Sequence, residues 1–238
     1  MLRKLSLLST AMLVSHVALA ADEGEPAAWK GEAELGLVYT SGNTETDTVS
    51  AKAKISREQD KWRHAGEFSA FNTSDKTGTT AERYEVKGQS DYKFSKREYI
   101  FGIVNYENDR FSGYDYRVSE SIGYGRRVLE RSDMTLDLEA GPGARQSKLD
   151  NGDSDSEFLV RGAAKYAWSI SKTSKFTEDL TVEAGQDATI TKSVTALSSK
   201  INGDLAMRLS YTFKHTSDVP PGIEKTDTET AVTLVYSY

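Results

Sequence analysis

Apolar and polar residues alternate with a period of two along most of this chain of 238 residues. In the segment 29–40, Leu35 and Leu37 fall on one face, and Glu32 and Glu34 fall on the other. Successive side chains of a β-strand point to opposite sides, so the alternation predicts strands with one apolar and one polar face.

Twelve segments follow this pattern: 29–40, 46–58, 62–72, 81–94, 99–107, 116–128, 134–145, 156–168, 175–185, 191–200, 204–216 and 227–238. Most hold about 11 residues, close to the about 9–11 that a tilted strand needs to cross a bilayer and above the about 5–6 of an ordinary globular strand. In 99–107 and 191–200 the two faces are similar in character. The pattern predicts an all-β fold, a transmembrane antiparallel up-and-down β-barrel of twelve strands.

The connections between these segments form two alternating sets. One set is short, and the other contains longer stretches rich in Gly, Asp and Ser, at 72–79, 108–115, 146–155 and 217–226. Bacterial barrels have short periplasmic turns and longer external loops, and an even number of strands places both termini on the periplasmic side. We therefore expect the longer connections at the outer end of the barrel.

Aromatic residues gather at both ends of the expected strands. Those expected in a periplasmic girdle are Trp29, Trp62, Trp168, Tyr236 and Tyr238. Two aromatic belts separated by apolar residues are typical of the two membrane interfaces. Tyr238 ends the chain within a strand pattern, and we expect the barrel-assembly machinery to recognise this C-terminal aromatic strand.

The first twenty residues have the pattern of a cleaved Sec-type signal peptide. Arg3 and Lys4 precede an apolar stretch, and a small-residue pattern predicts cleavage between Ala20 and Ala21. We expect 21–28 to be a short periplasmic segment and 29–238 to be the barrel. The chain contains no cysteine, so no disulfide framework or lipid attachment at a cysteine is expected. The expected location is the cell outer membrane, in contact with its lipid and lipopolysaccharide.

The charge balance narrows the classes of function. The formal net charge is −6, and removing the two basic residues of 1–20 makes it −8. An acidic chain without a basic face disfavours nucleic-acid binding. After Ala21 no stretch of about eighteen apolar residues occurs, which excludes transmembrane helices. No cofactor is expected.

Charged residues occupy the face of the strands expected to line the lumen. They are Glu32, Glu34, Lys52, Lys54, Arg83, Lys87, Asp137, Glu139, Arg161, Lys165, Asp179, Glu183 and Arg208. Opposite charges on adjacent strands can pair across the ladder and brace the wall. Alternatively, the unpaired charges can form a constriction for ions or small solutes. The two signs are nearly balanced, so the sequence predicts no ionic selectivity.

The chain resembles a known family in three stretches: "WKGEAELGLVYTSGNTET" near the start of the first strand, "SDVPPGIEKTDTET", and the closing "AVTLVYSY". The resemblance is to the YdiY-like salt-induced outer-membrane proteins, whose defining domain has no assigned function. It spans essentially the whole mature chain, and the turn Ser41 to Glu45 is its most specific element. It implies an outer-membrane barrel linked to salt conditions, and it supplies no catalytic residues.

A lipid hydrolase is the enzymatic alternative, because some outer-membrane barrels hydrolyse lipids. After the signal peptide, only His64 and His215 can serve as imidazole bases, and the topology places them about 25 Å apart at opposite rims. His215 lies near Ser210 and Ser217, but no orienting third group can be identified. The sequence therefore predicts no catalytic residues and no enzyme activity.

One acidic stretch, 149–157, supplies oxygen ligands that calcium prefers. Its candidate ligands are Asp150, Asp153, Asp155 and Glu157. Their spacing differs from the twelve-residue helix–loop–helix pattern, so we expect an acidic external loop rather than a dedicated metal site. Cations that bridge lipopolysaccharide could also contact it.

Two residues fit the barrel pattern poorly. Glu120 falls on the lipid-facing side between Val118 and Ile122, which predicts either a bulge or a position near the outer interface. Pro142 cannot donate a ladder hydrogen bond, so we expect its strand to bulge or to leave the membrane there.

Overall fold

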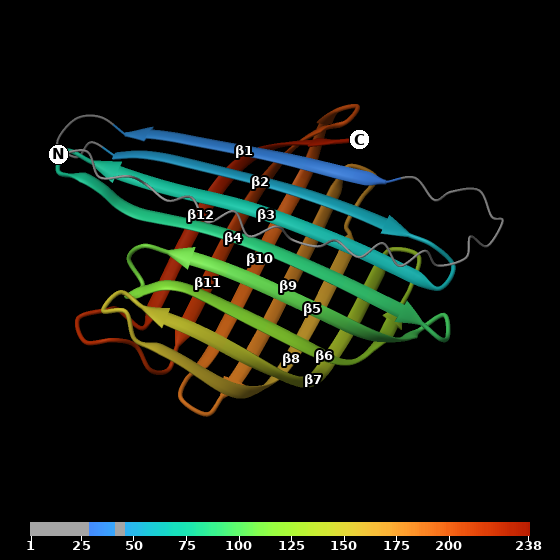
Figure 1. Cartoon of the computed structure of the whole chain (residues 1–238). Helices are drawn as coiled ribbons and strands as arrows, with labels where there is room; N and C mark the ends of the chain where they lie inside the picture. Colours follow the sequence, from blue (N-terminus) through green and yellow to red (C-terminus); the bar gives the residue numbers. More distant parts are fainter. Residues whose placement is uncertain (1–28, 41–45) are drawn as a thin grey trace, which may run out of the picture.

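The computed structural model describes residues 29–40 and 46–238. These residues form twelve antiparallel strands that close into a barrel, in which each strand pairs with its sequence neighbours and the first pairs with the last (Figure 1). The strands are β1 (Lys30–Thr40), β2 (Thr46–Glu58), β3 (Trp62–Asp75), β4 (Gly78–Lys93), β5 (Glu98–Asp109), β6 (Tyr114–Glu130), β7 (Met134–Leu149), β8 (Ser154–Ser169), β9 (Ser174–Gly185), β10 (Thr189–Asn202), β11 (Leu205–Thr216) and β12 (Thr226–Ser237).

The predicted twelve-stranded antiparallel barrel is confirmed, including the strands expected at 99–107 and 191–200. The expected signal peptide, the segment 21–28 and the turn 41–45 lie outside the described residues. Within those residues, no helix is long and apolar enough to cross a membrane.

The outer surface of the barrel is an apolar belt. Large apolar side chains from every part of the wall are exposed there, and Phe158 is 76% exposed. In a protein surrounded by water, such a continuous apolar surface would be unfavourable. It is the surface that lipid selects on a transmembrane barrel.

The expected contrast in loop length is largely wrong. Strands β3 to β8 extend into the stretches expected as long loops, which leaves only 76–77, 110–113 and 150–153 as connections there. Their Thr- and Ser-rich ends continue the ladder because backbone pairing does not depend on apolar side chains. In the described part of the chain, one long connection remains at this end, 217–225 between β11 and β12. We call this end the loop end, and the opposite end, where Lys30 and Ser237 lie, the turn end.

Strand β7 contradicts the expected interruption at Pro142. It runs unbroken to Leu149, and its register with β6 is the same on both sides of the proline. The ladder only lacks pairs where Gly141 and Pro142 face Ile122 and Gly123, since proline has no N–H to donate. A Cβ on either glycine would overlap the facing backbone, so the two strands approach closely here.

Glu120 shows no bulge either. It keeps its register with Val104 on β5 and Ala144 on β7 and lies exposed on the outer face. Of the two alternatives, the bulge is excluded, and the carboxylate lies on the outer surface of the barrel.

A short seam closes the barrel between β1 and β12. Their register runs from the Glu32–Ser237 pair to the Leu35–Leu234 pair. Gly31 and Tyr238 extend the seam with two backbone hydrogen bonds, at N···O distances of 2.9 and 3.0 Å. The Tyr238 ring occupies the space of a Gly31 side chain. The last residue of the chain is therefore part of the closure, beside the start of β1 (Figure 1).

Inside the barrel, β5 places large side chains over small residues of β6. Tyr99, Phe101 and Ile103 point inward and are buried as one cluster. In register, Tyr99 faces Gly125 and Phe101 faces Gly123. Gly125 leaves room for the Tyr99 ring, so the turn-end part of this wall is filled by side chains.

Gly125→Ala tests this packing, because its Cβ would overlap the Tyr99 ring. We expect the free energy of unfolding to fall by about 1–3 kcal/mol, as is usual for overpacking. Urea titration of the refolded protein in detergent, followed by tryptophan fluorescence, measures it. The matched control is Gly102→Ala, where nothing lies within 4 Å of the added methyl group. Equal losses in both variants would contradict the packing.

Candidate functional site in the barrel lumen

The lumen holds a central cavity of about 570 Å³. Ten of the sequence-predicted charged residues line it: Glu32, Glu34, Lys52, Lys54, Arg83, Lys87, Arg161, Lys165, Asp179 and Glu183. The other three lie beside it. Asp137 and Glu139 are buried in the wall, and Arg208 pairs with Glu32 and Glu34.

The sequence-predicted residues partly pair as adjacent strands allow. Glu139 on β7 binds Arg161 and Lys165 on β8, at N···O distances of 2.9 and 2.7 Å. Asp137, by contrast, binds Arg127 on β6 through two bonds of 2.7 and 2.9 Å. The shortest ion pairs of each carboxylate are thus made with one of its two neighbouring strands.

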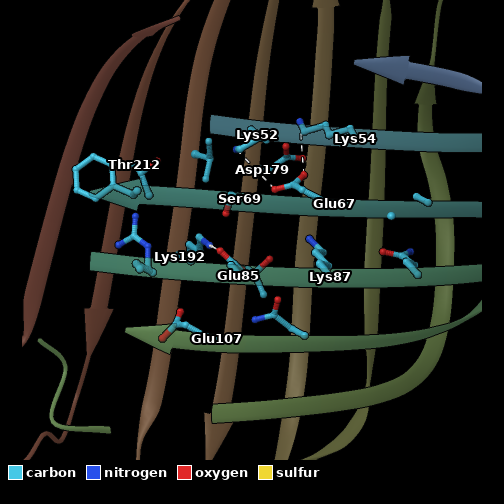
Figure 2. A pocket seen from close by; sticks show the side chains of 18 of the residues that line it. Lys52, Lys54, Glu67, Ser69, Glu85, Lys87, Glu107, Asp179, Lys192 and Thr212 are labelled. Atoms are coloured by element: carbon cyan, nitrogen blue, oxygen red, sulfur yellow. Dashed lines mark hydrogen bonds and ion pairs between the residues drawn. The ribbon is translucent and has the colours of Figure 1, made fainter. Parts of the chain in front are cut away.

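Other predicted charged residues pair with residues outside the predicted set. Lys52 and Lys54 on β2 both contact Glu67 on β3, each with an N···O distance of 3.6 Å, rather than Glu32 or Glu34 on β1 (Figure 2). Glu183 on β9 contacts Arg145 on β7 at 3.4 Å rather than Arg161 or Lys165 on β8. Asp179 has no hydrogen bond or ion pair with any other described residue, and its exposed side chain faces the cavity.

A buried polar network fills the turn-end half beside β5. Glu139 accepts hydrogen bonds from the Tyr99 hydroxyl at 3.0 Å and from Gln89 at 2.9 Å, in addition to its two cations. Arg161 is 2% exposed, and its guanidinium lies 5.3 Å from the centre of the Phe101 ring. Buried charges are stable only when their partners are in place, so this network holds the wall and its filling together.

Besides a contact of 3.9 Å between Arg63 on β3 and Asp137 on β7, three ion pairs join distant walls of the barrel. Glu85 on β4 binds Lys192 on β10 at 2.6 Å, and Glu107 on β5 binds Lys214 on β11 at 2.7 Å. Each of these pairs spans six of the twelve strands, so it crosses the lumen between opposite walls. Arg83 on β4 pairs with Glu229 on β12. We call these three the cross-lumen pairs. Arg117 on β6 completes the site of Glu107 at 2.6 Å.

The cross-lumen pairs narrow the passage towards the loop end. A second cavity of about 430 Å³ lies there. It shares six lining residues with the central cavity: Phe71, Arg83, Arg117, Thr212, Lys214 and Glu229. These are strand side chains, and four of the six are charged. The partition between the two cavities is therefore a constriction of paired charges.

The connection 217–225 partly covers the loop end. Pro220 and Ile223 pack against Gly113, in the β5–β6 hairpin on the opposite side of the barrel. Gly113 has a φ of 78°, a left-handed conformation that glycine adopts readily, and a side chain there would crowd Pro220. The loop thus crosses the mouth and contributes Val219, Gly222, Ile223 and Glu224 to the outer cavity.

The expected girdle residues lie near the turn end. Trp62 stacks on His64 with ring centres 5.7 Å apart and meets Tyr92 edge-on at 5.2 Å. Tyr236 stacks on Tyr238 at 6.3 Å. Trp29 is half exposed beneath the Arg57 guanidinium, and Trp168 faces Phe176 in register on β9.

The two histidines His64 and His215 lie at opposite ends of the barrel, each beside a hydroxyl side chain. The His64 ring contacts Ser90 at 2.8 Å and Trp62 near the turn end. His215 contacts Thr226 at 2.9 Å and stacks on Phe213 near the loop end. Ser210 lines the cavity, five residues from His215 on the same strand and so on the opposite face. The arrangement brings neither histidine to a nucleophile in the lumen.

The acidic stretch near β8 is held by protein groups. Glu157 accepts hydrogen bonds from Arg145 at 2.7 Å and from the Asp187 backbone N–H at 2.8 Å. Repulsion by Asp155 raises the pKa of Asp187 above its ordinary value. Asp150 and Asp153 lie at the β7–β8 turn, where Asp153 bonds Asn151. In the part of the chain that the structure describes, no group of three or more His, Cys, Asp or Glu residues could hold a metal ion.

Comparison with known proteins assigns the family. Residues 33–238 match the family described as "Protein of unknown function, DUF481". The chain belongs to this family. It is also 29% identical over 212 residues to "Uncharacterized protein YdiY" of Escherichia coli (strain K12), covering 88% of this chain and 83% of that protein. The resemblance found in the sequence is confirmed.

Solved structures share the fold of this family member. The NanC porin superposes with a TM-score of 0.55 at 14% identity, covering 88% of this chain and 98% of that chain. An outer membrane channel from Pseudomonas putida F1 superposes with a TM-score of 0.51 at 10% identity, covering 92% and 100%. At these identities the likeness establishes the barrel fold, which resembles that of outer-membrane porins and channels.

Glu139→Gln tests the buried network. Removing its charge leaves Arg161 buried without a full partner, and we expect the free energy of unfolding to fall by about 3–5 kcal/mol. The control is Glu130→Gln, which loses an exposed pair with Arg97 and should cost at most about 1 kcal/mol. Urea titration in detergent measures both variants. A loss for Glu139→Gln no larger than the control's would refute the role of the network.

Proposed function

We propose that the chain is an outer-membrane barrel with a narrow, charge-lined pore for ions or small polar solutes. The apolar outer surface and the likeness to outer-membrane porins and channels support this location. The observation that carries the pore is the pair of cavities that share a constriction of side chains. Strand side chains separate the two spaces, and a side-chain constriction can transmit small solutes that a backbone plug would stop.

Twelve strands suit this role. About eight strands enclose a space that side chains fill, and sixteen or more leave a wide aqueous channel. Here the turn-end half is filled by side chains only on the side beside β5. On the other side the central cavity reaches towards the turn end, where it is lined by Lys30 on β1 and Ser56 on β2. The passage would run along the β1–β3 wall and then between the cross-lumen pairs.

Conductance of the refolded protein in a planar lipid bilayer tests the pore. We expect reproducible unit steps in KCl. The double variant Arg83→Ala/Glu229→Ala removes the cross-lumen pair whose two side chains line both cavities, so the unit conductance should rise. The control Asp115→Ala/Lys148→Ala removes an exposed pair at the loop end, at 3.2 Å, and should leave the conductance unchanged.

A barrel that folds, as judged by heat-modifiable migration on a gel, but stays silent in both forms would overturn the pore. That outcome would favour a closed structural or binding barrel that acts through its external loops. The position of 217–225 across the mouth is the observation that favours this second candidate. A lipid hydrolase has less support: Ser210 and His215 face opposite sides, and among the described residues no carboxylate bonds either histidine to complete a triad.

A link to salt or osmotic conditions is part of the proposal, and it rests on the family resemblance. Salt screens partly exposed pairs more than buried ones, so the pairs of Glu67 with Lys52 and Lys54 would weaken first. Growth of a strain that lacks the gene, at high and low NaCl, tests the link. Unchanged growth at both would count against it.

The partners of the barrel are also proposed. Membrane lipid and lipopolysaccharide would surround the apolar belt and the acidic loop end. The C-terminal strand would be read by the assembly machinery before closure, because the Tyr238 backbone and ring complete the seam with Gly31 in the folded barrel.

A further inference from the structure

A row of charged residues crosses three neighbouring strands on the lumen side. In register, Glu67 on β3 faces Lys54 on β2 and Lys87 on β4. Lys52 and Lys54 both contact Glu67 at 3.6 Å (Figure 2). One carboxylate is therefore shared between two lysines, and a third lysine stands next to it on the other side.

Lys87 is the cation that this row leaves over. It lines the central cavity and forms no hydrogen bond or ion pair with residues 29–40 or 46–238. The nearby Glu85 forms an ion pair with Lys192 across the lumen, with an N···O distance of 2.6 Å. Asp179 and Glu107 also lie near these lysines (Figure 2), but over the whole lining of the central cavity 11 lysines and arginines face 8 carboxylates, which leaves an excess of positive charge.

Asn105 supplies a second group without a partner. It faces Lys87 in register on β5, and both side chains line the central cavity. Its Oδ1 atom is buried and accepts no hydrogen bond from any described residue. A buried acceptor without a donor is unfavourable, so such atoms usually mark a place that water or a ligand completes.

The chemistry of these neighbours identifies a ligand class. The Lys87 ammonium donates hydrogen bonds and attracts an anion, whereas Asn105 Oδ1 needs a donor such as a hydroxyl. We propose that this part of the lumen binds small hydroxylated organic acids, with the carboxylate at Lys87 and a hydroxyl at Asn105. The role of this site in selecting solutes rests on the pore function proposed above.

Titration calorimetry of the refolded protein, in a non-ionic detergent at low salt, tests the site by measuring equilibrium binding. The probe is gluconate. Sorbitol has the same type of hydroxyl chain without the charge, and propionate has the charge without hydroxyls. We expect gluconate to bind. The dissociation constants of sorbitol and of propionate should each be at least about tenfold higher, because sorbitol lacks the charge-assisted hydrogen bond and propionate lacks the hydroxyl hydrogen bond.

Two variants separate the two contacts. Lys87→Gln should weaken gluconate about tenfold. Asn105→Ala should weaken gluconate but leave propionate unchanged, since propionate offers no hydroxyl to Oδ1. Lys148→Gln, at the exposed loop end, is the control that should change neither. Gluconate that does not bind, or that binds equally well to the wild type and to both lumen variants, would overturn the site.

Ion selectivity gives a second, independent measurement. In a KCl gradient across a bilayer, the reversal potential of the wild type should indicate anion preference. Lys87→Gln should shift it towards cations. Asp179→Asn, which removes the unpaired carboxylate on β9, should shift it towards anions. A cation-preferring pore that does not respond to Lys87→Gln would overturn the inference.

The two sets of measurements distinguish the site from the pore. Binding in detergent does not require a continuous lumen, so gluconate binding by a silent barrel would refute the pore and keep the site. Conductance steps without gluconate binding would keep the pore and refute the site.

Discussion

Charge pairing inside the barrel is the interaction on which the rest of the structure depends. A wall of twelve strands encloses more space than apolar side chains fill here, and its inner face carries many charged groups. Burying these charges is favourable only when each has a partner. The Glu107–Lys214 and Glu85–Lys192 pairs supply partners from opposite walls, so they neutralise each other's charge and place side chains across the lumen.

The cluster of large side chains on β5 fills part of the same interior space with apolar groups. The Tyr99 ring occupies an inward position because Gly125 on β6 leaves the space, and Phe101 and Ile103 are buried beside it. Arg161 then lies against the Phe101 ring and closes onto Glu139. Apolar packing and ion pairing therefore cooperate on one side of the turn-end half, and the open volume remains on the β1–β3 side, where Lys52, Lys54 and Glu67 keep looser contacts of 3.6 Å.

This asymmetry relates the fold to the proposed pore and its solute. Tightly paired charges contribute rigidity but little selectivity, because their fields cancel at short range. Groups without partners act on a solute instead, and in the described lumen Lys87, Asp179 and the Asn105 oxygen are such groups. A constriction of paired charges with a few free groups beside it is an arrangement that can transmit small solutes and discriminate between them.

The sequence by itself determined the twelve strands, their antiparallel closure and the inward face of the charged residues, because alternation with a period of two depends only on local geometry. It also determined the family. The ends of strands β3 to β8, the unbroken course of β7 at Pro142 and the absence of a bulge at Glu120 depended on backbone pairing with neighbours, which no local pattern contains. The apolar character of both faces in 99–107 was the visible sign of the inward cluster at Tyr99. The partners of Glu85, Glu107 and Glu67 were decided only by the tertiary structure, because barrel closure and shape bring residues of distant strands within reach of one another.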